Sequence, residues 1–404
     1  MRQWLLAIVC FGATACFGVT GGVASRALAE DPVAFRAETI DDSVAIGYGV
    51  AAGDVDGDGK LDLILADKTE FVWYRNGDWR RFVLARDLTV MDNVCLAARD
   101  IDGDGRVEIA VGALWNPGDT ENSGSVHYLI PPDDRTQLWE AVELPREPTV
   151  HRMKWVRLAP QRFALVVVPL HGRGNRNGEG AGVKVLAYEP PADVREPWTL
   201  STVDESLHMT HNFEVIPPST EDGPESLLIV GREGARLSRW DGEAWQSQAI
   251  DRIEGSGEVR VGMTTPGEQL IATIEPMHGD KLVVYPVLGD CRGSDWSVAD
   301  RWVIDDSYNA GHAVAIGDLL GTGADQIVAG WRLPNAEGKV GLRLYWRVAD
   351  ERFESMWIDD NTMATEDAIL ADLDGDGDLD VVAAGRATKN LKVYWNLRDE
   401  NPAR

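Results

Sequence analysis

Positive charge and cysteine are both scarce in this chain. Of its 404 residues, 39 are Lys or Arg and 66 are Asp or Glu, so the formal net charge is −27, and only eight of the basic residues are lysine. Binding to nucleic acid depends on basic side chains that neutralise phosphates, and an anionic lipid surface would repel such a chain in the same way. We therefore expect neither nucleic acid nor a membrane surface among its partners.

The cysteines are too few for a disulfide framework. Cys10 and Cys16 lie in the apolar N-terminal segment, which leaves only Cys95 and Cys291 in the remainder of the chain. These two are far apart in the sequence, and two thiols do not make a disulfide-stapled scaffold. We expect both to be unpaired.

Long apolar runs are missing except at the N-terminus. Arg2 is followed by a largely apolar stretch from Trp4 to Ala24 and then by Ala27-Leu28-Ala29. A basic start, an apolar middle and an A-x-A end are typical of a secretory signal peptide. We predict that residues 1–29 are a signal peptide and that the mature protein is exported to the periplasm or the extracellular space. The alternative is an uncleaved membrane anchor, since the run is long enough to form one.

An internal repeat fills the rest of the chain. Three segments share an acidic signature, and they are GDVDGDGKLDLILAD from Gly53, RDIDGDGRVEIAVGA from Arg99 and ADLDGDGDLDVVAAG from Ala371. A fourth segment, GDLLGTGADQIVAGW from Gly317, keeps the frame without most of the acids, and three others keep only the apolar rhythm. When all these segments are aligned on Asp54, the residue of each segment that falls at the position of Asp54 is called its anchor. The anchors are residues 54, 100, 157, 217, 264, 318 and 372, which makes seven units.

Each unit has the pattern of four short strands. One strand enters the acidic turn, one leaves it, and an aromatic-rich run and a final run follow; this pattern with a period near 50 indicates propeller blades. The last unit stops after its third strand at Trp395-Asn396, whereas residues 35–41 form an isolated strand before the first unit. We predict an all-β fold, a single seven-bladed β-propeller of four-stranded blades over residues 30–398. The N-terminal strand would close its ring, and a short tail would follow at 399–404.

The acidic turns have the spacing of calcium loops. In DVDGDGKLD, carboxylates occupy positions 1, 3, 5 and 9 and a backbone carbonyl occupies position 7, an arrangement that suits Ca²⁺. The predicted ligands are Asp54, Asp56, Asp58, Lys60 (carbonyl) and Asp62 in the first turn, Asp100, Asp102, Asp104 and Glu108 in the second, and Asp372, Asp374, Asp376 and Asp380 in the third. The alternative is three acidic turns without a metal.

The sixth unit has lost this pattern. Only Asp318 remains, with Leu320 and Thr322 at the next ligand positions, so we expect no tight site there. Taken together, the turns resemble those of the FG-GAP/VCBS-repeat propellers, and the resemblance extends over nearly the whole chain after the signal peptide. It implies the propeller fold and structural Ca²⁺, but no particular activity.

One position per blade lies at the mouth of the central channel, on the face opposite the acidic turns. Six residues before each anchor, this position holds Tyr48, Val94, His151, His211, Glu258, His312 and Glu366. Neutral imidazoles from adjacent blades and one carboxylate can form a His₂Glu set with an open fourth position, which is typical of catalytic Zn²⁺. We predict a divalent metal, Zn²⁺, held by His151, His211 and Glu258. His312 would be a further ligand or would face the substrate. The alternative is a hydrated polar channel without metal.

The second strands of the blades end on the same face and carry further polar residues. We assign acid–base roles to His171, His278 and Glu366, and we assign substrate binding to Arg173, Arg232, Trp331, Arg332 and Arg386. The stretch GRGNRNGEGAG after His171 is too long for a hairpin turn and has no G-K-[ST], so it is not a phosphate loop. We predict that it is a lid over the channel.

The third and fourth units have a narrower resemblance. The stretch HRMKWVRL…LVVVPLHGRGN…HMTHNFEV resembles the propeller domain of the fungal aldos-2-ulose dehydratase/isomerase family, which removes water from keto- and anhydro-sugars with a metal. The resemblance implies a metal-dependent lyase acting on a small sugar. The cupin-type domains of the isomerase step have no counterpart in these residues, so only dehydration carries over. The competing interpretation is a non-catalytic secreted propeller that binds a glycan or a protein on this face.

Overall fold

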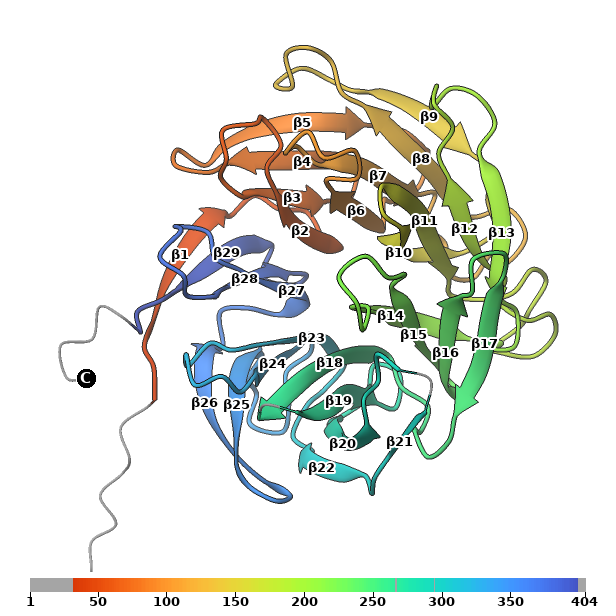
Figure 1. The fold of residues 1–404 in the computed structure, drawn as a ribbon. Helices are drawn as coiled ribbons and strands as arrows, with labels where there is room; N and C mark the ends of the chain where they lie inside the picture. Colours follow the sequence, from red (N-terminus) through yellow and green to blue (C-terminus); the bar gives the residue numbers. More distant parts are fainter. Residues whose placement is uncertain (1–31, 266, 294, 399–404) are drawn as a thin grey trace, which may run out of the picture. The chain divides into compact units, whose positions relative to one another are not determined.

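Seven antiparallel sheets are arranged around a common axis, like the blades of a propeller (Figure 1). This computed structural model describes residues 32–265, 267–293 and 295–398, so the segments predicted as signal peptide and tail lie outside the described residues. All strands belong to the compact unit that begins at Val33. The described residues contain no helix, and therefore none that could span a membrane. The all-β, seven-bladed fold predicted from the repeat is confirmed.

The blades follow one another along the chain, and the first four each run in sequence order from the innermost strand outward. Blade one contains β2 (Gly49–Gly53), β3 (Asp62–Ala66), β4 (Glu70–Arg75) and β5 (Arg80–Arg86). Blade two contains β6 (Cys95–Arg99), β7 (Glu108–Ala113), β8 (Ser125–Ile130) and β9 (Glu140–Leu144). Blade three contains β10 (Val150–Ala159), β11 (Arg162–Pro169), β12 (Val185–Glu189) and β13 (Thr199–Asp204). Blade four contains β14 (Thr210–Ile216), β15 (Ser226–Gly231), β16 (Gly234–Trp240) and β17 (Trp245–Ile250).

Blade five departs from the pattern at its outer edge. It contains β18 (Glu258–Thr265), β19 (Glu268–Glu275) and β20 (Lys281–Gly289), followed by two short strands, β21 (Trp296–Val298) and β22 (Trp302–Asp305). Both short strands pair with β20, at opposite ends of it, and together they take the place of one outer strand. Blade six contains β23 (Gly311–Gly317), β24 (Gln326–Trp331), β25 (Gly341–Ala349) and β26 (Arg352–Asp360).

Blade seven combines the two ends of the propeller. It contains β27 (Thr365–Ala371), β28 (Asp380–Gly385) and β29 (Asn390–Asn396), and its outer strand is β1 (Phe35–Asp41). β1 pairs antiparallel with β29, with Phe35 opposite Asn396 and Asp41 opposite Leu391. This is the pairing predicted from the isolated N-terminal strand. It covers an edge of β29 that would otherwise expose unpaired backbone groups.

The hydrophobic core lies between neighbouring blades. Strands β3, β7, β15, β24 and β28 are buried along their whole length. On β3, Ile64 packs toward blade two, whereas Leu63 and Leu65 pack toward blade seven. A strand covered on both faces needs apolar residues at every position, which explains the continuous apolar runs after each turn. Cys95 and Cys291 are buried and free, as predicted.

Candidate functional site

Three imidazoles meet at the channel mouth. His211 and His312 are the second residues of β14 and β23, and His278 comes from the turn between β19 and β20. One ligand-capable nitrogen from each lies within 4.8 Å of the others, and Nε2 of His211 is 2.7 Å from Nε2 of His278. The ring centroids of His278 and His312 are 4.9 Å apart. His278, predicted as an acid–base residue, thus lies together with His211 and His312 in one imidazole cluster.

Backbone carbonyls of the following blade orient the imidazoles that the inner strands carry. Nδ1 of His151 is 2.8 Å from the carbonyl oxygen of His211, and Nδ1 of His211 is 3.0 Å from that of Gly257. Nδ1 of His312 contacts the carbonyl oxygen of Glu366 at 2.5 Å. A carbonyl only accepts, so each Nδ1 carries the hydrogen and each Nε2 keeps its lone pair in the neutral ring. Fixing the tautomer in this way is how proteins prepare histidines for metal binding.

Glu258 supports His211 from behind. Its Oε1 is 3.0 Å from Nδ1 of His211, and its Oε2 accepts from Nδ2 of Asn212 at 2.5 Å. Burial alone would raise the pKa of Glu258, but its contact with His211 and the charge of Arg152 outweigh burial and hold the pKa below its usual range. The carboxylate is thus an ionised partner of His211 and stands outside the imidazole cluster. Glu258, predicted as a metal ligand, thus lies behind His211, whereas the ligand-capable atoms that meet belong to His211, His278 and His312.

The imidazoles of the cluster are held in the neutral form. Burial lowers the pKa of His211, and it lowers that of His312 well below the usual value for histidine. The pKa of His278 is also lowered, by burial of the ring and by the neighbouring His211. Neutral imidazole is the form of histidine that binds a metal ion.

His151 lies beside the cluster but is engaged elsewhere. Its ring centroid is 4.5 Å from that of His211 and 5.1 Å from that of Trp115. Nη1 of Arg152 is 3.2 Å from Nε2 of His151, so the lone pair of that nitrogen faces a guanidinium. The sequence patterns did not single out Trp115, which lies two residues after β7, just as His171 lies two residues after β11. This shared position, two residues after the second strand of a blade, is the sequence signal that could have identified Trp115.

An ion-pair group borders the cluster on the side of blade seven. The carboxylate of Glu366 lies 3.3 Å from Nη1 of Arg332 and 2.9 Å from Nη1 of Arg386. The guanidinium of Arg386 lies over the ring of Tyr48, whose hydroxyl donates to Asp92 at 2.9 Å. Two of the four arginines predicted to bind substrate, Arg332 and Arg386, are therefore oriented by Glu366, whose backbone carbonyl contacts His312 of the cluster.

The other three residues predicted to bind substrate make contacts within the protein. Trp331 is fully buried and stacks on Tyr308 with ring centroids 4.7 Å apart, so it cannot reach a ligand, which corrects its substrate-binding assignment. Nη1 of Arg232 donates to the carbonyl of Asn177 at 2.5 Å, and Arg173 pairs with Glu147. Arg173 and Arg232 thus tether the glycine-rich loop that follows His171.

His171 lies two residues after the end of β11, on the face of the channel mouth. Its backbone N–H donates to the hydroxyl of Thr149 at 2.9 Å, and Thr149 comes two residues before His151. The ring is buried, its Nδ1 has no hydrogen-bond partner among the described residues, and burial lowers its pKa. No contact between His171 and the imidazole cluster is found in the described part of the chain.

The acidic turns share one geometry. In the first, Oδ1 of Asp54 accepts from the N–H of Gly57 at 2.6 Å and Oδ2 accepts from that of Gly59 at 2.8 Å. Both glycines have φ near +85°, a region that other residues rarely adopt. Each of these turns brings the oxygens of three carboxylates within 4.8 Å of one another. The three sets are Asp54, Asp56 and Asp58 in the first turn, Asp100, Asp102 and Glu108 in the second, and Asp372, Asp374 and Asp376 in the third. These groups suit a hard cation such as Ca²⁺.

Blade six keeps the shape of the acidic turn, although the neutral side chain of Gln326 stands at the position of Asp62. Oε1 of Gln326 accepts from the N–H of Leu320 at 2.8 Å, just as Oδ2 of Asp62 accepts from that of Val55 at 2.9 Å. Asp318 still accepts from the N–H of Gly323 at 2.7 Å. The fold of the turn therefore does not require the carboxylates that the other three turns carry.

Comparisons with known protein families match two parts of the chain. Residues 123–287 match a family model described as "Aldos-2-ulose dehydratase, beta-propeller domain", and residues 54–111 match one described as "FG-GAP-like repeat". The first segment includes His211 and His278 but ends before His312. Both resemblances stated from the sequence are thus found. None of the curated proteins matches the chain.

Solved structures share the fold at low sequence identity. The Kuenenia stuttgartiensis hydrazine synthase is 11% identical with a TM-score of 0.53, covering 87% of this chain and 95% of that chain. The Cps50 (Swd1) β-propeller domain of Myceliophteria thermophila is 12% identical with a TM-score of 0.53, covering 89% and 99%. A chain of a mitotic checkpoint complex is 12% identical with a TM-score of 0.56, covering 98% and 99%. These likenesses show the fold alone.

Proposed function

We propose that His211, His278 and His312 bind a divalent transition metal, Zn²⁺, and that the protein is an exported lyase that dehydrates a keto- or anhydro-sugar. The observation that carries this proposal is the imidazole cluster, whose nitrogens converge from three blades, with the tautomers of His211 and His312 set by backbone carbonyls. The match of residues 123–287 to a dehydratase propeller supports the choice of reaction.

The donor set fits such an ion. Three imidazole nitrogens within 4.8 Å of one another supply the number and type of ligands found in zinc sites that keep a fourth position for water or substrate. The carbonyls behind Nδ1 of His211 and His312, and the carboxylate of Glu258, are the usual partners of metal-binding histidines. When bound there, the ion supplies Lewis-acid polarisation of the substrate carbonyl.

Residues around the cluster would position the sugar and move its proton. The ring of Trp115 offers an aromatic face, and Arg332 and Arg386 offer donors to hydroxyl groups. His171, on the face of the channel mouth and kept neutral by burial of its ring, is the base in this proposal. It would take the proton from the carbon next to the carbonyl and return it to the departing β-hydroxyl, so that water leaves and a carbon–carbon double bond forms.

We also propose that the three acidic turns hold structural Ca²⁺ and that residues 1–29 direct export. The carboxylate groups in the turns support the first part. The basic start, apolar run and A-x-A end support the second.

The test is turnover by the mature protein loaded with Zn²⁺ and Ca²⁺. Keto-, anhydro- and glycosidic sugars are supplied separately, and the absorbance of the enone product is followed. We expect turnover of a keto- or anhydro-sugar, loss of turnover with retained metal in His171→Ala, and no change in His208→Ala, whose histidine is exposed and pairs with Glu233. Stoichiometric zinc without turnover of any sugar would contradict the lyase and favour the glycan-binding propeller.

A further inference from the structure

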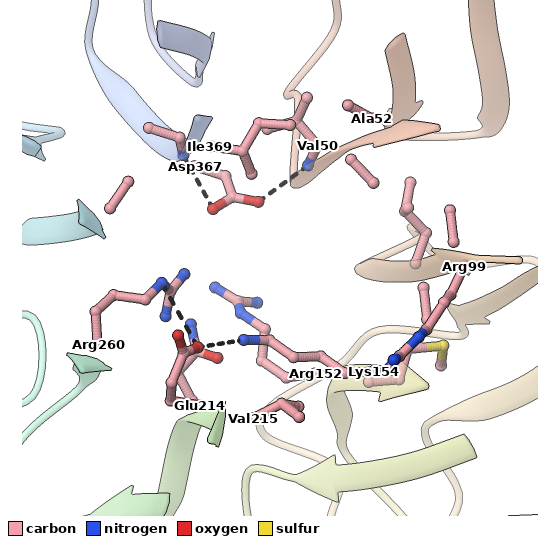
Figure 2. A pocket seen from close by; sticks show the side chains of 18 of the residues that line it. Val50, Ala52, Arg99, Arg152, Lys154, Glu214, Val215, Arg260, Asp367 and Ile369 are labelled. Atoms are coloured by element: carbon pink, nitrogen blue, oxygen red, sulfur yellow. Dashed lines mark hydrogen bonds and ion pairs between the residues drawn. The ribbon is translucent and has the colours of Figure 1, made fainter. Parts of the chain in front are cut away.

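The inner strands of the blades line an open cavity of about 490 Å³ in the central channel (Figure 2). Arg152 and Asn212 line it, and both also approach Glu258 behind the cluster. At the other end, Arg99 lines the cavity immediately before the acidic turn at Asp100. The cavity is therefore separate from the proposed metal position and extends toward the calcium face. Its volume is that of a site for a small organic molecule.

Positive charge gathers on one wall of this cavity, although the protein is strongly acidic. Arg152 and Lys154 come from β10 and Arg260 comes from β18, and Figure 2 shows their side chains converging. The side chains of Arg152 and Arg260 are 13% and 14% exposed, so these charges are largely removed from water. A fourth cation, Arg99, is already neutralised by two hydrogen bonds to Glu225.

The carboxylates nearby leave much of this donor capacity unused. Glu214 accepts from Nζ of Lys154 at 2.7 Å, but it lies 3.9 Å from Nε of Arg260, beyond hydrogen-bond distance. Nη1 of Arg260 donates to the carbonyl of its neighbour, Val259. Nη1 of Arg152 is 3.2 Å from Nε2 of His151 and donates to the carbonyl of His151 at 3.1 Å, whereas its Nη2 is 4.0 Å from Glu258. An anion in the cavity would accept from these guanidinium groups in charge-assisted hydrogen bonds, which the carboxylates at 3.9 and 4.0 Å do not make.

The opposite wall carries an acceptor. The carboxylate of Asp367 accepts from the backbone N–H groups of Val50 at 2.9 Å and Ala368 at 3.0 Å, and no cation of the described residues lies within ion-pair distance. Figure 2 shows it across the cavity from Arg152 and Arg260. The apolar residues Val50 and Ile369 line the cavity beside Asp367. The cavity thus has cationic donors at one side and a carboxylate acceptor at the other.

We propose that this cavity binds a small hydroxy-carboxylate with a single negative charge, such as a sugar acid. Its carboxylate would pair with Arg152 and Arg260, whose planar guanidinium groups match that geometry. A hydroxyl group at its other end would donate to Asp367. Glu214 and Asp367 would repel a second negative charge, so a dianion is disfavoured. This inference is independent of the proposed lyase activity, because none of these residues belongs to the imidazole cluster.

The test is calorimetric titration of the mature protein with Ca²⁺ present and transition metals removed. Sodium gluconate is the probe, and sorbitol, acetate and inorganic phosphate at matched ionic strength are the comparisons. We expect one gluconate per chain, with each comparison at least about tenfold weaker, the scale of one lost hydrogen bond to a charged group. No saturable heat with gluconate, or equal binding of sorbitol, would overturn the proposal.

Substitutions test which residues of the cavity bind gluconate. Arg260→Gln should weaken gluconate binding by about tenfold or more, and Arg260→Lys should weaken it less, because the charge remains while the planar fork is lost. Asp367→Asn should reduce the preference for gluconate over acetate. Arg252→Gln, which removes an exposed arginine paired with Asp300, is the matched control and should change nothing. Unchanged affinity in both Arg260 variants, each shown by circular dichroism to be folded, would also overturn the proposal.

Discussion

Nε2 of His211 and Nε2 of His278 lie 2.7 Å apart, although the residues are 67 positions apart and belong to blades four and five. His278 has φ of +54°, in the left-handed region that residues other than glycine seldom occupy. Strained backbone of this kind persists where the surrounding structure imposes it, often at functional sites. Two neutral rings at this distance share one hydrogen, unless a metal ion takes its place.

The first prediction concerns the metal in this cluster. His211→Ala and His312→Ala should each abolish stoichiometric binding of Zn²⁺ in equilibrium dialysis with Ca²⁺ present, because the two remaining imidazoles are too few ligands to hold the ion. Glu258→Gln should keep the site but weaken it by about 10- to 100-fold, as loss of a partner behind a ligand does. Elemental analysis of the dialysed proteins measures both effects.

The matched control for the cluster is His151→Ala. His151 contacts His211 but directs its own Nε2 at Arg152, so its removal should leave the zinc content unchanged. Zinc retained in His211→Ala, or lost equally in His151→Ala and His312→Ala, would contradict the assignment of ligands.

The second prediction concerns calcium in the acidic turns. A ligand that binds only the folded state stabilises it by about 2.7 kcal/mol per site when its concentration is a hundred times Kd. Chelation should therefore lower the melting temperature. Asp56→Ala, Asp102→Ala and Asp374→Ala should each remove part of that effect, which scanning calorimetry with and without chelator measures.

Blade six provides the internal control for calcium. Gln326 replaces the buried carboxylate there, so Asp318→Ala should leave calcium content and the chelator effect almost unchanged. Identical melting curves with and without chelator, for protein freed of calcium, would show that the turns are structural without a metal.

The third prediction concerns an Asp–Tyr contact that recurs between blades. Asp359 at the end of β26 accepts from the hydroxyl of Tyr394 on β29 at 2.7 Å, and Asp41 and Asp305 accept in the same way from Tyr74 and Tyr345. Tyr394→Phe should lower the free energy of unfolding by about 2 kcal/mol, since a hydrogen bond to a charged group is lost. Urea denaturation at neutral pH measures this.

The pH dependence of this contact has a definite sign. Burial would raise the pKa of Asp359, but the hydroxyls of Thr362 and Tyr394 and the charge of Lys392 outweigh burial and lower it. The stabilisation is therefore complete above the unfolded pKa of about 3.9 and is lost as the pH falls through the folded pKa. Tyr188→Phe is the control, because Tyr188 donates to a neutral carbonyl and its loss should show no such dependence. Equal pH profiles for the two variants would contradict this account.

The fourth prediction concerns closure of blade seven. Deleting residues 31–41 removes β1 and leaves β29 as an exposed edge, so the deletion should aggregate or unfold with reduced cooperativity. A peptide of residues 32–42 supplied in excess should restore cooperative melting. A deletion variant that stays monomeric and melts like the parent would rule out the closing role of β1.

The repeat predicted most of the fold because its signals are local. Acidic turns follow β2, β6 and β27, and the isolated strand before the first unit indicated the pairing of β1 with β29. The split outer edge of blade five, β21 and β22, carried no comparable signal. The sequence also suggested that Trp331 is accessible, whereas its indole stacks on Tyr308 and is fully buried. An aromatic residue at a strand end looks the same in the sequence whichever way its ring turns.

For the histidines at the channel mouth, too, the sequence predicted one part of the arrangement and the tertiary structure decided the other. Their spacing from the anchors was enough to bring His151, His211 and His312 to one rim, because every inner strand starts at the same level. Which nitrogens meet depended on the backbone of other blades: on the carbonyls of Gly257 and Glu366 that orient two rings, and on the left-handed turn that brings in His278. Periodicity along one strand reports the level of a residue but not the rotation of its side chain. That rotation is set by neighbours more than forty residues away.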